Sequence, residues 1–177
     1  MFSNAVQHES GGSRVKSLTI RLPVLAAALW WGSMSVTGFM AVPLLFLHLP
    51  SKALAGGVAA HLFAGQTWVS VACGIVLLLR LRPQHAPTRV SGAAQTTLVF
   101  VLAGLLAALL LQYAVAPRIL ARVDLRLWHS AGVALYALQW LCAGAALWRL
   151  IPACVLGRVN LDQAVDRLQT SRTPHEH

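Results

Sequence analysis

The sequence predicts an all-α membrane protein, a bundle of four transmembrane helices. Of its 177 residues, 57% are hydrophobic and 11% are charged, whereas about a quarter of the residues in a typical soluble domain are charged. Asp, Glu, Lys and Arg are absent from four stretches of 22 to 30 residues, which are Leu22–Ser51, Ala53–Leu79, Val90–Pro117 and Leu127–Trp148. A helix needs about 20 apolar residues to cross the hydrocarbon core, so each stretch holds one crossing and none holds two.

The domain organisation follows from these stretches. Residues 1–17 lack an apolar pattern and are expected to form a disordered cytoplasmic lead. A transmembrane domain is expected over residues 18–152, with spans at about 22–47, 55–79, 93–116 and 127–151. The remaining residues, 153–177, are expected to form a short cytoplasmic tail.

Three prolines shape the expected helices. Pro43 removes a backbone donor late in the first helix, which predicts a kink near Phe39. Pro117 and Pro152 each follow an apolar run and are expected to end the third and fourth helices.

The order of motifs suggests two tandem helical hairpins. "AVP" at residues 41–43 ends the first helix, and "AVAP" at residues 114–117 ends the third. In each case the next helix carries a histidine near its start and then a glutamine near mid-membrane, namely His61 and Gln66 in one hairpin and His129 and Gln139 in the other. Such a repeat would be related by an axis along the membrane normal.

The charge distribution indicates the orientation. The formal net charge of +9 does not predict nucleic-acid binding, because the basic residues flank membrane spans, where topology and anionic lipids explain them. With the N-terminus inside, the inner flanks carry Arg14, Lys16, Arg21, Arg80, Arg82, Arg89, Arg149 and Arg158, and the outer flanks carry Lys52, Arg118, Arg122 and Arg126. We therefore expect a bacterial inner-membrane protein with both termini in the cytoplasm.

Two helix faces repeat the same residue types in the outer half of the membrane. They are Gly57, His61, Gly65 and Trp68 on the second helix, and His129, Gly132, Tyr136 and Trp140 on the fourth. Glycine one turn from histidine leaves room for a flat ligand, and neutral imidazole is a common axial ligand of haem. The sharpest hypothesis is therefore binding of haem b or copper between these two helices by His61 and His129, with His48 as a weaker third metal ligand.

The same residues have a simpler interpretation. Glycines also permit close helix packing, and a shallow histidine such as His129 can lie at the interface beside the anchor Trp128. Gln66 and Gln139 are then interhelical hydrogen-bonding residues, because amides in lipid must find partners. This alternative is a structural bundle that binds lipids and either a second copy or another membrane-complex partner, without a ligand.

Enzymatic function is disfavoured. No carboxylate lies within a span, so the usual proton relay of pumps and coupled transporters is absent from the sequence. No nucleophile–base pair, phosphate loop or HExxH motif is recognisable. A further hypothesis, passive export of small solutes, needs a continuous polar path, which four spans could form only as an oligomer.

Three segments carry a family resemblance: "LWWGSMSVTGFMAVPLLF" (29–46), "AAHLFAGQTWVS" (59–70) and "WHSAGVALYALQW" (128–140). Over residues 25–147 they resemble the bacterial family known as domain of unknown function 4149, which is similar to the eukaryotic transmembrane protein 205 group. The resemblance implies four spans without an established activity. More distantly, the layout resembles copper-resistance-D-like proteins, which implies haem or copper at His61 and His129. Ser130 stands where related sequences commonly have glycine after the last-helix histidine.

Overall fold

The computed structural model describes residues 21–81 and 92–172, which are helical apart from short turns at residues 49–51 and 121–124. The predicted lead and the loop of residues 82–91 lie outside these residues. Within the described part, four helices are long and apolar enough to cross a membrane: Arg21–His48, Lys52–Leu81, Gln95–Leu120 and Leu125–Pro152. The predicted all-α, four-span membrane fold is confirmed.

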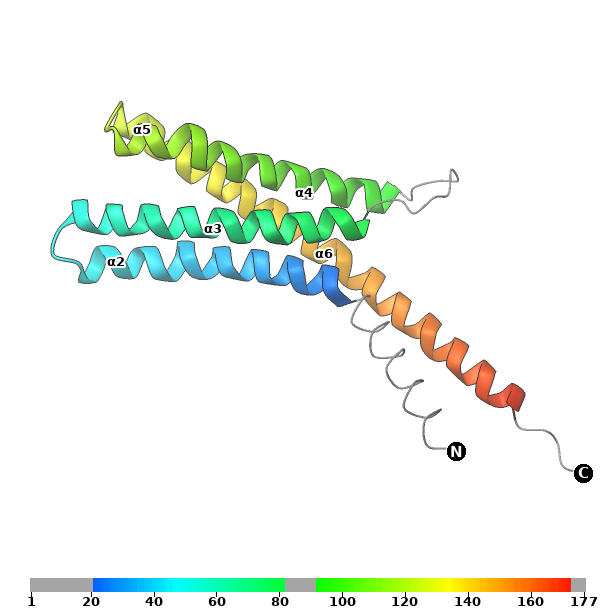
Figure 1. Ribbon diagram of the computed structural model, residues 1–177. Helices are drawn as coiled ribbons and strands as arrows, with labels where there is room; N and C mark the ends of the chain where they lie inside the picture. The colour runs from blue at the N-terminus through cyan, green and yellow to red at the C-terminus, as the bar shows by residue number, and fades with distance from the viewer. Residues whose placement is uncertain (1–20, 82–91, 173–177) are drawn as a thin grey trace, which may run out of the picture.

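The four spans pack side by side. The first span comprises helical residues 21–36, the π-helical turn η1 (Thr37–Ala41) and α2 (Val42–His48), and the second is α3 (Lys52–Leu81). The third comprises α4 (Gly92–Leu110), the π-helical turn η2 (Leu111–Val115) and α5 (Ala116–Leu120), and α6 (Leu125–Arg172) contains the fourth. In Figure 1 the first span runs alongside α3, and α6 passes behind both and continues beyond the bundle.

The first and third spans share one feature, a π-helical turn just before a proline. The Val42 N–H, one residue before Pro43, donates to the Thr37 carbonyl, and the Ala116 N–H, one residue before Pro117, donates to the Leu111 carbonyl. Each of these bonds joins residues five positions apart instead of four, which widens the helical turn. The wider turn makes room for the proline ring, which in a regular α-helix would clash with a backbone carbonyl of the preceding turn. Near Phe39, where a kink was expected, the first span thus contains a π-helical turn.

Two helix ends differ from expectation. The third span continues through Pro117 to Leu120, because η2 accommodates the proline. The fourth helix does not stop at Pro152 but continues to Arg172. Pro152 lies at the end of the span, where water can bond to the carbonyl that the proline leaves without a donor, so the helix is not forced to end there. The segment that follows Pro152, expected to be a short tail, is therefore helical as far as Arg172.

Two short turns join the spans on the side of the molecule where α2 ends. Ser51 caps α3, since its Oγ accepts from the Leu54 N–H at 3.2 Å. The turn before α6 is tighter, with positive φ at Arg122 (55°) and Asp124 (37°). Asp124 tolerates this conformation and its carboxylate accepts from the Leu127 N–H at 3.4 Å. The tight turn holds the third and fourth spans antiparallel and adjacent.

The core is small and the outward surface is apolar. Trp30, Met34, Leu77 and Val101 are the largest fully buried apolar side chains, and alanines such as Ala27 and Ala143 fill the space between them. Large apolar side chains cover the outside, which suits a bundle surrounded by lipid tails.

Candidate functional site

The face of α6 that carries Tyr136 and Trp140 packs against the first span. The Tyr136 hydroxyl donates to the Met34 carbonyl at 2.7 Å, and the Trp140 indole N–H donates to Ser35 Oγ at 2.8 Å. Both acceptors lie just before η1, which places the irregular turn of the first span next to this face. Tyr136 and Trp140, predicted to line a pocket between the second and fourth helices, bind the first helix instead.

Aromatic contacts add to this packing of α6 against the first span, which we call the seam. The Trp140 ring lies 5.5 Å from Trp31 and packs edge-on against Phe39 at 5.7 Å, while Tyr136 meets Phe63 of α3 edge-on at 5.2 Å. Gly38 permits the approach of Tyr136, since a Cβ at that position would lie only 2.7 Å from the ring. On the side of Tyr136 and Trp140 that faces the first span and α3, side chains of those helices therefore fill the space that a flat ligand would need.

The matching face of α3 points away from the bundle. His61 and Gly65 are exposed, as is Trp68 with 67% of its surface accessible, and a Cβ at Gly57 or Gly65 would meet no atom within 4 Å. The helical rotation explains this orientation. His61 lies about 140° around the helix from the buried Gln66 and about 180° from the buried Ser70.

The remaining candidate ligands are also dispersed. His129 is exposed near the start of α6, and Gly132 is buried against η2 and α5, with Val115 and Ile119 3.5 Å from the position of a Cβ. His48 is exposed at the end of α2, with its Nδ1 3.0 Å from the Leu44 carbonyl. Among the described residues, no three His, Cys, Asp or Glu side chains lie close enough to hold a metal ion.

These positions do not fit a haem shared by two histidines of one chain. Such a ligand needs both imidazoles directed into one space. His61, however, faces outward from α3, and the face of α6 that carries His129 and Tyr136 is turned toward the first span. The three-histidine metal set fails for the same reason.

The glutamines lie where the packing hypothesis places them. Gln66 Nε2 donates to Ser33 Oγ at 2.9 Å, and its Oε1 accepts from Thr37 Oγ1 at 3.3 Å. Gln139 Nε2 donates to Ser70 Oγ at 2.8 Å. Both amides are buried and join different helices, so their predicted role as interhelical hydrogen-bonding residues is confirmed.

Three serines, which the sequence analysis did not single out, supply the acceptors for these hydrogen bonds between helices. Ser33, Ser35 and Ser70 each donate their hydroxyl hydrogen to a carbonyl three or four residues back in their own helix. Each serine oxygen then accepts from a side-chain N–H of another helix, supplied by Gln66, Trp140 and Gln139 respectively. The spacing of serine from tryptophan and glutamine was visible in the sequence, but their pairing across helices was not.

The comparisons with known proteins identify one family. The profile described as Domain of unknown function (DUF4149) matches residues 25–126, more than half of the chain. The matched segment contains the first three spans and both π-helical turns, and it ends at the start of α6. Neither a curated protein nor a solved structure matches the chain. The likeness to the transmembrane protein 205 and copper-resistance-D-like groups stays a prediction.

Proposed function

We propose that this chain, which belongs to the DUF4149 family, acts as a ligand-free membrane bundle that associates with a second copy of itself through the outward face of α3. We call Gly57, His61, Gly65 and Trp68 the α3 face. The observation that supports the proposal is an ionisable side chain, His61, on a surface that otherwise meets lipid. His61 is about 14 Å along the helix axis from the start of α3, inside the span.

The chemistry of His61 favours a second copy as the partner. A polar group in lipid needs a hydrogen-bonding partner, because no water is available there. A neutral imidazole has one N–H donor and one nitrogen acceptor, so two copies related by a twofold axis can satisfy each other. Gly57 and Gly65, one turn on either side of His61, allow the two helices to approach closely.

The interior of the bundle supports the same conclusion. The buried amides and serines bond to one another across helices rather than pointing into open space. This pairing favours a packed interior over the continuous polar path that a passive exporter would need within one chain. We further propose a bacterial inner membrane as the location and cytoplasmic positions for both termini, on the distribution of Lys and Arg given above.

Cysteine cross-linking in native membranes tests the dimer. In a background lacking Cys73, Cys142 and Cys154, Gly65→Cys is expected to give a disulfide-linked dimer on mild oxidation. The matched control is Leu106→Cys on the lipid-facing side of α4, where the native side chain is 58% exposed. Adding His61→Leu to Gly65→Cys should lower the cross-linked fraction several-fold. Equal cross-linking at both cysteine positions, or no effect of His61→Leu, would contradict the proposal.

A second candidate function follows from the same outward histidine. Two copies of His61 across the twofold axis can take opposite sides of one haem, with Gly57 and Gly65 giving clearance. The oxidised and dithionite-reduced absorption spectra of the purified dimer separate the two cases. A Soret band lost in His61→Ala supports a haem between copies, whereas a cross-linked dimer without one supports the ligand-free bundle.

A further inference from the structure

A groove runs along α6 on the lipid-facing side of the bundle. The groove follows α6 from Trp140 to Arg149, which is its lower end. Trp31 of the first span lines it beside Trp140, Gly144 and Ala145 line its middle, and Phe100 of α4 lines it beside Arg149. Apart from Arg149 the lining is apolar. Gly144 allows the Trp31 ring, one wall of the groove, to lie close to α6, since a Cβ at Gly144 would lie 2.9 Å from Trp31 Nε1.

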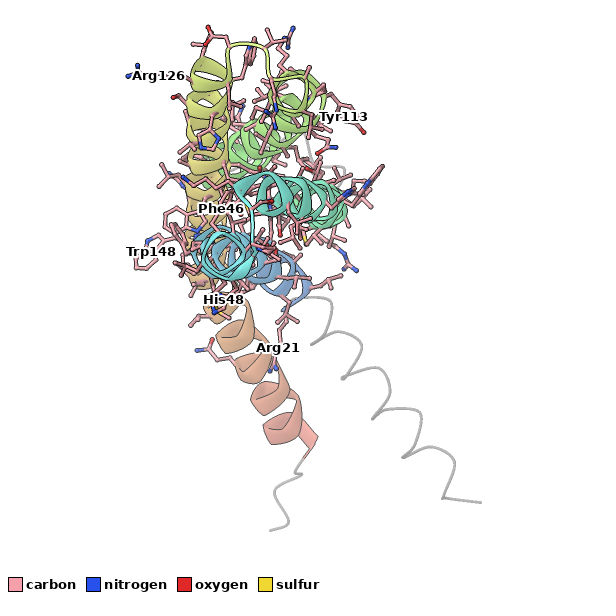
Figure 2. The ribbon with its side chains drawn as sticks, turned by 90° about the vertical axis from the view of Figure 1, so that its left-hand side faces the viewer. Arg21, Phe46, His48, Tyr113, Arg126 and Trp148 are labelled. Carbon is pink, nitrogen blue, oxygen red and sulfur yellow. The ribbon has the colours of Figure 1, made fainter. Side chains whose placement is uncertain are left out.

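The residues of α6 that line the groove extend over about the thickness of one leaflet's hydrocarbon region. Trp140 and Arg149 are nine residues apart, about 14 Å along the helix, which is about half of a 30 Å hydrocarbon core. Arg149 lies near Pro152, where the fourth span ends. The neighbouring Trp148 is 78% exposed and lies on the outside of α6 (Figure 2), as expected of an aromatic anchor at headgroup level.

Among the residues whose side chains the structure describes, no carboxylate lies near the charge of Arg149. No Asp or Glu lies within twelve residues of Arg149 in the sequence, and Asp124, the carboxylate with a described side chain, is at the opposite end of the span. The Arg149 guanidinium lies 5.6 Å from the Phe100 ring, a contact that fixes it at the mouth of the groove. Arg21 and Arg80 lie at the same end of the bundle, because the first span begins there and α3 ends there.

We propose that this groove binds one anionic phospholipid, with the phosphate on Arg149 and an acyl chain along Gly144 and Ala145 toward Trp31 and Trp140. A planar guanidinium forms paired hydrogen bonds to phosphate oxygens, and basic sites between transmembrane helices are typical binding places for anionic headgroups. Net negative charge is preferred because three arginines gather at this end without a neighbouring described carboxylate. The site is independent of the α3 face.

Native mass spectrometry of the full-length protein, extracted from vesicles of equimolar phosphatidylglycerol and phosphatidylethanolamine, tests the site. We expect the wild-type protein to retain phosphatidylglycerol over phosphatidylethanolamine by about fivefold. Arg149→Gln should bring this ratio close to one, and Arg149→Lys, which keeps the charge but loses the paired hydrogen bonds, should keep part of the preference. Ala145→Phe fills the groove and should reduce retention of both lipids.

Arg126→Gln is the matched control, because it removes an exposed arginine from the other end of the same span. It should leave the lipid ratio unchanged. The proposal is overturned if the wild-type protein shows no preference, if Arg126→Gln lowers the ratio as much as Arg149→Gln, or if Ala145→Phe leaves lipid retention intact. It is also overturned if Ala145→Phe changes the oligomeric mass, since the groove would then be a protein interface. Labelling of the buried Cys73 and Cys142 checks that each variant is folded.

Discussion

Helices α3 and α6 carry the same residue types along one face, histidine, glycine and tryptophan, yet the two faces have opposite surroundings. On α6, Tyr136 and Trp140 are half-buried and bonded to the first span. On α3, His61 and Trp68 are exposed, and none of the helices that the structure describes covers them. The residue pattern alone does not distinguish a packing seam from an open face.

The difference lies in the residues on the other sides of each helix. α3 turns Gln66 and Ser70 inward, and these side chains bond to the first span and α6. This fixes the rotation of α3 about its axis and sends His61 outward. On α6, Gln139 and Tyr136 both point inward, so the seam and the amide network lie on adjoining sides of one helix.

The largest expected difference in stability between the two faces comes from removing one aromatic ring from each. Tyr136→Ala loses the bond to Met34 and the contact with Phe63, and should destabilise the bundle by about 2–4 kcal/mol. Trp68→Ala should change the stability of the monomer by less than about 0.5 kcal/mol. Thermal unfolding in detergent, followed by dye labelling of the buried Cys73 and Cys142 in a Cys154→Ser background, measures both. Equal losses would mean that the α3 face is also packed.

Glycine substitutions sharpen the comparison. Gly144→Ala places a Cβ 2.9 Å from Trp31 Nε1 and should cost about 1–3 kcal/mol, because the rigid ring has to move. Gly65→Ala meets no atom within 4 Å and should raise monomer stability by up to about 1 kcal/mol through its higher helix propensity. The same thermal assay applies, and a gain at position 144 would contradict the tight seam.

The two glutamines should differ from each other. Gln66→Leu removes bonds to Ser33 and Thr37, whereas Gln139→Leu removes one bond to Ser70, which keeps its own bond to the Gln66 carbonyl. We expect a loss of about 1–2 kcal/mol for Gln66→Leu and about 0.6 kcal/mol for Gln139→Leu. Unfolding by sodium dodecyl sulfate in mixed micelles gives both values, and a reversed order would indicate that Ser70 depends on Gln139.

The smallest expected effect is at His129. It lies one to two turns before Gly132 and Tyr136 on the packed face but is itself exposed, so His129→Ala should change stability by less than about 0.5 kcal/mol. The control is Trp128→Ala, which removes the ring 4.3 Å from the Arg118 guanidinium and should cost about 0.5–1 kcal/mol. A larger loss for His129→Ala than for Trp128→Ala would show that the seam extends to the end of α6.

Much of the fold could be predicted from the residues. The charge-free stretches predict the four spans, and Pro43 predicts the irregularity that η1 supplies. Gln66 and Gln139 are interpretable as interhelical partners because an amide in lipid has few alternatives. The end of the last helix could not be predicted from Pro152, because the cost of a proline depends on whether water reaches the freed carbonyl.

By itself, the sequence determined which segments cross the membrane, that the first span deviates from a regular α-helix before Pro43, and which residues share a helix face. These properties depend on hydrophobic length, on proline and on the 3.6-residue repeat, all of which are local. Only the tertiary structure decided that Tyr136 and Trp140 face the first span and that His61 faces outward. The rotation of each helix is set by bonds between residues 29 to 105 positions apart, such as Gln66 to Thr37 and Trp140 to Ser35, and no local pattern encodes that choice.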